Sequence, residues 1–257
     1  MIKRDENLRL LAGLPIHVNG VGDIYTKTLK EIAEIGESKY NQFLSILTVD
    51  IKDLDVDEES KQKLEEDNIN TFIILLSQCK NDQSGEFKEM VENALSFFIG
   101  QEVVLILNAG VFYVGDKERL QTIENLDNEC LLTNDNYEEF KRILLSQNCI
   151  KEKKEKYKPA NKKAKRIAEK LKQSKEVINE QKSKSGEKLD LYDLVSAFSA
   201  YSNSVNIIDV WDLTFYQFND QFQRTQLIED YEISIQSLLH GADKNKVEIK
   251  HFIRKMD

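Results

Sequence analysis

The sequence predicts a mainly helical α+β protein: an N-terminal domain of helices with two small β-hairpins, a charged helical connector and a helical C-terminal domain. Three features of the 257-residue chain support this prediction. Apolar residues recur at helical spacing in most segments, two pairs of short apolar runs are joined by glycine-containing turns, and one stretch is strongly basic. The changes in composition place the domains at 1–150 and 187–257 and the connector at 151–186.

Two hairpins are predicted in the N-terminal domain. In the first, residues 8–25 consist of two apolar arms around Asn19-Gly20, and this dipeptide is the strongest local signal of a hairpin turn. In the second, the apolar runs 102–107 and 111–114 flank a loop that contains Gly110.

Helices account for most of the remaining N-terminal residues. Thr26 or Thr28 can cap the first of them, and Asn134 or Asp135 can cap the last. The apolar run 72–76 fits a buried helix or a strand, and the sequence does not decide between them. The predicted helices span residues 29–35, 38–47, 58–66, 86–99 and 133–147.

The connector is basic, whereas the rest of the chain is acidic. Residues 151–184 carry 14 Lys and Arg against 5 Glu, and the remaining chain carries 22 basic against 40 acidic residues. A helix with a thin apolar stripe is predicted over residues 161–181, and it is typical of a solvated connector. Docking on an acidic surface and nucleic-acid binding are the alternatives. The basic patch comprises Lys162, Lys163, Lys165, Arg166, Lys170 and Lys172.

In the C-terminal domain, the run 189–198 is predicted to start a helix that ends near residues 202–204, and the densest aromatic spacing in the chain follows. If Asp209 or Asp212 caps a helix, four rings at steps of 4, 3 and 4 fall on one helical stripe, and a second apolar set follows before Gly241. Such a stripe is typical either of a protein's own core or of a partner-binding surface. The four rings are Trp211, Phe215, Phe218 and Phe222.

The start of this stripe resembles a motif of the tail assembly chaperones of long-tailed bacteriophages. Trp211, Leu213, Thr214 and Gln217 match it, with Phe215 in place of the usual proline. The threonine and glutamine also predict a capping box, in which each side chain bonds the other's backbone amide. The resemblance implies a protein that holds the tape-measure or tail-tube protein during tail assembly and performs no chemistry, with Thr214, Gln217 and the rings binding the partner.

No catalytic motif is present, so we expect no enzyme. The chain lacks a nucleophile elbow and a glycine-rich phosphate loop, and its three histidines and three cysteines are too widely spaced for a metal site. The acidic run at 53–60 lacks the glycine of a calcium loop. We therefore expect no metal and no cofactor.

The expected function is that of a phage tail assembly protein that acts in the host cytoplasm and binds another protein. Neither a signal peptide nor an apolar run of membrane-spanning length is visible, so no membrane partner is expected. The alternatives are a structural subunit of a virion tail or baseplate, and a nucleic-acid-binding protein that uses the connector. Self-association is also left open.

Overall fold

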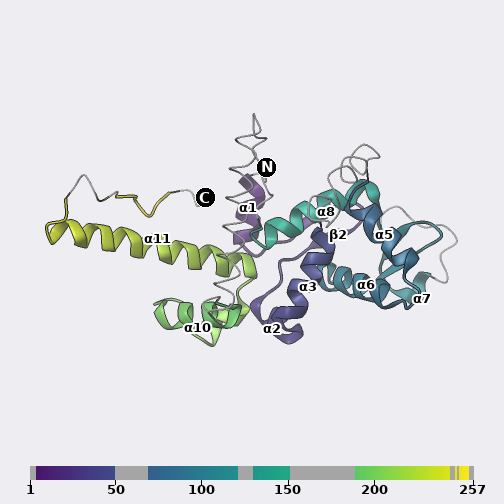
Figure 1. Ribbon diagram of the computed structural model, residues 1–257, viewed down its shortest axis with the longest axis horizontal. Helices are drawn as coiled ribbons and strands as arrows, with labels where there is room; N and C mark the ends of the chain where they lie inside the picture. The colour runs from purple at the N-terminus through teal and green to yellow at the C-terminus, as the bar shows by residue number, and fades with distance from the viewer. Residues whose placement is uncertain are drawn as a thin grey trace, which may run out of the picture. The chain divides into compact units, whose positions relative to one another are not determined.

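The computed structural model describes residues 4–49, 69–120, 130–150, 189–243, 247 and 249–254 (Figure 1). Within these ranges the protein is mainly helical with two small antiparallel sheets, which confirms the predicted fold class. In chain order the elements are α1 (Arg4–Leu11), β1 (Ile16–Val18), β2 (Gly22–Ile24), α2 (Leu29–Ile35), α3 (Glu37–Thr48), α5 (Thr71–Asn81), α6 (Glu86–Ile99), β3 (Val103–Ile106), β4 (Val111–Val114), α7 (Lys117–Leu120), β5 (Leu131–Leu132), α8 (Asn134–Gln147), α10 (Leu191–Tyr201), the 3-10 helix η3 (Asp209–Asp212) and α11 (Phe215–Leu239).

The chain forms two compact units, one of residues 1–150 together with 211–257 and one of residues 151–210. Contacts therefore group the last helix with the N-terminal half of the chain. The domain boundaries that composition suggests, after residues 150 and 186, remain a prediction. The helices predicted at 58–66 and 161–181 lie outside the described residues.

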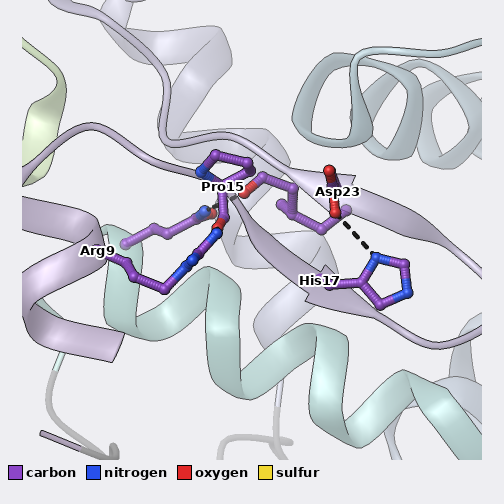
Figure 2. A network of polar contacts seen from close by, with 6 residues as sticks. Arg9, Pro15, His17 and Asp23 are labelled. Atoms are coloured by element: carbon purple, nitrogen blue, oxygen red, sulfur yellow. Dashed lines mark hydrogen bonds and ion pairs between the residues drawn. The ribbon is translucent and has the colours of Figure 1, made fainter. Parts of the chain in front are cut away.

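Polar contacts hold the first hairpin, whose strands β1 and β2 pair as predicted. Figure 2 shows the Arg9 guanidinium of α1 at the Pro15 carbonyl oxygen, to which it donates two hydrogen bonds of 2.8 and 3.0 Å. On the hairpin itself, the His17 Nδ1 atom lies 2.9 Å from the Asp23 carboxylate across the two strands. The apolar arm that the sequence predicts from residue 8 is wrong in its first part, because residues 8–11 belong to α1.

Capping residues explain why the apolar run at 72–76 is helical. The side chain of Asn70 accepts a hydrogen bond of 3.1 Å from the Ile73 amide and so opens α5. The predicted caps of α8, Asn134 and Asp135, are wrong by one or two residues, because Thr133 is the cap and forms a capping box with Asn136.

The predicted second hairpin is confirmed by β3 and β4, whose loop contains Gly110 at φ 66°. A third strand, β5, pairs with β4 through Leu131 and Leu132, and two residues are too few to give a strand pattern in the sequence. The sheet thus has the order β3-β4-β5.

An aromatic cluster around α8 forms the centre of the first unit. The ring of Tyr137 lies 5.3 Å from Phe72 and 5.9 Å from Phe140, and Phe72 lies 5.9 Å from Phe112. The Tyr137 hydroxyl donates a hydrogen bond of 2.9 Å to the Leu47 carbonyl, so its polar end is satisfied although the side chain is fully buried. Helices α3, α5 and α8 and strand β4 therefore share one core.

Candidate interaction surface on the C-terminal helix

Helix α11 begins with the capping box that the sequence predicts. The Thr214 hydroxyl accepts a hydrogen bond of 3.2 Å from the Gln217 amide, and the Gln217 side chain accepts one of 2.9 Å from the Thr214 amide. Two backbone donors that the helix leaves unpaired are thereby satisfied. Asp209 and Asp212, the caps considered from the sequence, are wrong, because they lie in η3, before the helix starts.

The start of α11 is joined to the start of α2 by an antiparallel bridge between Thr214 and Thr28. The Leu29 amide donates to the Leu213 carbonyl at 2.9 Å, and the Phe215 amide donates to the Lys27 carbonyl at 2.8 Å. Thr28 is itself the cap of α2 and forms a capping box with Glu31. Two capped helix starts thus lie side by side and share backbone hydrogen bonds.

A further contact ties this junction to the end of α1. The Gln217 amide group donates a hydrogen bond of 3.0 Å to the Leu11 carbonyl. Gly13, at φ 70°, lies so close that a Cβ atom there would be 3.3 Å from the Gln217 amide nitrogen. The Gln217 side chain therefore hydrogen-bonds both to the start of its own helix and to the end of α1. Glycine at position 13 leaves room for this side chain and permits the positive φ.

The aromatic stripe predicted from the sequence is divided by the structure. Trp211 lies in η3 and not on α11, so it does not continue the helical stripe. Phe218 is buried, and its ring lies 5.9 Å from Phe222. The half-buried Phe215 ring lies 6.1 Å from Tyr40 of α3. These rings therefore pack within the protein's own unit, and their predicted role in partner binding stays a prediction.

Cys149, just after α8, lies against the same part of α11. Burial raises the pKa of its thiol to about 11, while a hydrogen bond with Asn219 acts to lower it and the Asp220 carboxylate acts to raise it. Burial, and then the neighbouring Cys149 and Asp220, also raise the pKa of the Tyr216 hydroxyl. At neutral pH both groups are protonated, which suits a packed contact and not a reactive centre.

The rest of α11 is less buried than its start. Phe218, in the first turn, is the one buried residue of the helix. A second apolar stripe begins at residue 228. At about 100° per residue, Tyr231 lies about 180° around the helix from Phe222, and the centre of the second stripe lies about 140° from that of the first. One helix therefore carries two apolar stripes that face different sides. The second stripe consists of Ile228, Tyr231, Ile235, Leu238 and Leu239.

Residues 249–254, called here the C-terminal segment, contact the beginning of this second stripe. Arg224 Nη1 donates hydrogen bonds to the carbonyl oxygens of Phe252, at 3.0 Å, and Arg254, at 3.1 Å. The Tyr231 ring lies 5.2 Å from His251 and 5.7 Å from Phe252. Sequence spacing gives no signal of this contact, since it joins a helix to a segment without regular structure.

The contact leaves an open hollow of about 550 Å³, lined by Arg224, Ile228, Phe252, Ile253 and Arg254. Beyond it the stripe is uncovered at its end, because the Leu239 side chain is 80% exposed. Helix α11 carries Asp220, Glu229, Asp230 and Glu232 against Arg224 as its charged residues, so the surface around the stripe is acidic.

The other predicted sites have a mixed outcome. All six residues of the basic patch lie outside the described residues, so the nucleic-acid alternative stays a prediction. No group of three potential metal ligands occurs in the part of the chain that the structure describes. Among the helices of those ranges, none has both the length and the apolar character needed to cross a bilayer.

Comparison with known protein families matches residues 180–257 to the model of the YomV second domain, which belongs to a phage-type family. This match contains η3, all of α11 and the C-terminal segment. The C-terminal part of the chain is thus similar to a phage-associated domain. None of the curated proteins and none of the solved structures compared with the chain matches it.

Proposed function

We propose that this chain is a non-enzymatic phage tail assembly protein that holds the tape-measure or tail-tube protein through the second apolar stripe of α11. The observation that carries the proposal is the contrast within one helix. Its first turn is capped and packed, whereas its last turns present aliphatic side chains to solvent. An apolar helix face of this kind is suited to bind a helix or an extended segment of another protein.

Two further features support the proposal. The second stripe repeats at steps of 3, 4 and 3 through Ile228, Tyr231, Ile235 and Leu238, which aligns these side chains along one face of the helix. The similarity of residues 180–257 to a phage-associated domain places this helix within the matched part of the chain. Assembly in the host cytoplasm, before the particle is complete, follows from a chaperone role.

Co-purification with the tape-measure and tail-tube proteins tests the proposal. The chain is expressed with each protein, and the wild type is compared with the double variant Ile235→Asp/Leu239→Asp. A carboxylate at either position removes apolar contact and adds charge to an already acidic surface, so the recovery of partner is expected to fall at least tenfold.

Ile233→Asp is the matched control. Ile233 is 60% exposed and lies on the same helix, but about 200° around it from Ile235, so the same substitution is expected to leave recovery unchanged. Equal recovery of the partner with all three chains would overturn the proposed surface. Detection of the chain in purified mature particles by mass spectrometry would instead favour the structural-subunit alternative.

A further inference from the structure

The C-terminal segment occupies the first part of the second stripe in the manner of a bound peptide. It has no helical or strand structure in the described residues 249–254, and it contacts α11 through backbone carbonyls and two rings. His251 and Phe252 are stacked with ring centroids 4.6 Å apart, and both rings lie beside Tyr231. The Arg224 guanidinium therefore binds carbonyl oxygens of the segment, and the Tyr231 ring contacts its two rings.

Arg224 is the centre of this recognition. One nitrogen of its guanidinium donates to the carbonyl oxygens of both Phe252 and Arg254, and the Arg254 amide donates to the Phe252 carbonyl at 3.0 Å. Hydrogen bonds to the charged guanidinium are stronger than those between neutral groups. Because both acceptors are main-chain oxygens, Arg224 recognises the conformation of the backbone and not a particular side chain.

Little of the C-terminal segment is buried. Ile253 is 76% exposed, and none of the residues 249–254 is buried. The hollow lined by Arg224, Ile228 and the segment itself is not filled. Few buried apolar contacts are typical of a region that opens locally at low cost.

We propose that residues 249–254 are a built-in ligand that covers the partner site on α11 and is displaced when the partner binds. The site accordingly takes an extended peptide segment with two neighbouring aromatic side chains and accessible backbone carbonyls. The inference rests on the proposed function, since it assigns the same stripe to the partner, and it adds both the chemistry of the ligand and a regulatory contact.

A labelled peptide tests the inference without any phage protein. The probe is a fluorescein-labelled peptide with the sequence of residues 247–257, and its binding to the full chain is measured by fluorescence anisotropy. The wild type is compared with Phe252→Ser, which removes a ring from the built-in segment and leaves the α11 surface intact. Phe252→Ser is expected to bind the peptide at least tenfold more tightly than the wild type, because its site is open.

Two further variants make the result specific. Ile249→Ser changes the same segment at a residue outside the ring contacts, and it is expected to behave as the wild type does. Phe252→Ser/Tyr231→Ala is expected to lose the peptide, because the ring on α11 is missing. Circular dichroism confirms that each variant retains its helices.

The inference is overturned if the wild type and Phe252→Ser bind the peptide equally, or if neither binds it at about 1 mM, a concentration that detects even weak association. A different result would contradict the proposed function without contradicting this inference. If the peptide pattern holds but neither the tape-measure nor the tail-tube protein is recovered with any variant, the site and its ligand chemistry stand and the phage partner is wrong. If the partner binds, Phe252→Ser is expected to recover several-fold more of it than the wild type.

Discussion

The first turn and the last three turns of α11 lie on one helix but have different roles. The first turn has a capping box, a backbone bridge to α2, a hydrogen bond to Leu11 and the buried Phe218. The last turns carry aliphatic side chains that solvent reaches, among them Leu239. The difference indicates that the aromatic, motif-like start of the helix is an anchor, whereas the surface proposed for the partner lies further along the helix and on a different side.

The largest effect is expected from Phe218→Ala, which should test the anchor directly. Deleting a buried ring removes apolar burial and leaves a cavity, so the free energy of unfolding should fall by about 3 to 5 kcal/mol. Urea denaturation followed by circular dichroism measures it. Ile233→Ala, at an exposed position of the same helix, should change it by less than about 0.5 kcal/mol. Equal effects of the two substitutions would contradict the division of α11.

Thr214→Ala should have the next largest effect, because it removes the cap at the junction with α2. We expect a loss of about 1 to 2 kcal/mol, the usual cost of deleting a capping side chain. The matched control is Thr225→Ala in the middle of α11, where the hydroxyl only donates to the Gln221 carbonyl of the same helix. If both variants unfold at the wild-type urea concentration, the capping box does not anchor the helix.

The two neighbouring capping boxes should differ in their response to pH. Burial acts to raise the pKa of Glu31, but hydrogen bonds from Thr28 and Lys27 and the charge of Lys27 outweigh it, so the pKa lies below its ordinary value of 4.5. A lowered pKa stabilises the fold above pH 4.5, and this contribution is lost as the pH falls through the folded pKa. Glu31→Gln should therefore lose less stability than the wild type between pH 6 and pH 3.

The reciprocal variant sharpens this prediction. Gln217 cannot titrate, so the box at α11 is expected to be independent of pH in the wild type. Gln217→Glu should add an acid-sensitive component to unfolding, measured by urea denaturation at the same series of pH values. An identical pH profile for the wild type and Glu31→Gln would show that the Thr28 box does not couple folding to protonation.

The smallest effect is expected from local opening at the start of α11, which is measured by the alkylation rates of two cysteines. Cys130 is exposed, whereas burial raises the pKa of Cys149 to about 11 beside α11. Iodoacetamide, followed by peptide mass spectrometry, should label Cys130 faster. Thr214→Ala should accelerate labelling of Cys149 while the rate at Cys130 stays constant. Unchanged labelling of Cys149 would mean that the start of α11 does not cover this thiol.

The sequence predicted what local interactions determine. The hairpin turns, the helix at 86–99 and the Thr214–Gln217 box all depend on residues within a few positions of each other, and all are confirmed. Of the two caps predicted for α2, Thr28 is the one that the structure has, and Thr26 is not a cap. The run 72–76 is ambiguous in the sequence, because its apolar residues fit a buried helix as well as a strand, and the Asn70 cap seen in the structure decides for the helix.

Features that join distant segments could not be predicted in this way. Two examples are the bridge between Thr28 and Thr214 and the contact of Arg224 with residues 252 and 254. Neither contact produces a recognisable residue pattern in the sequence. Its spacing from Phe215 predicts that Trp211 lies on the aromatic helix, but the helix starts only after the Thr214 cap. The different orientation of the two stripes follows from helix geometry once one continuous helix is established.

The hydrogen bond from Gln217 to the Leu11 carbonyl spans 206 residues, and this has a consequence for the order of folding. Closing so long a loop costs chain entropy before any contact compensates for it, so α11 should dock late, after the local helices have formed. During synthesis on the ribosome, residues 1–150 emerge first and begin to fold while the surface around Tyr40 is still bare. Completion of the first unit therefore waits until residues 211–239, which contain α11, have left the ribosome.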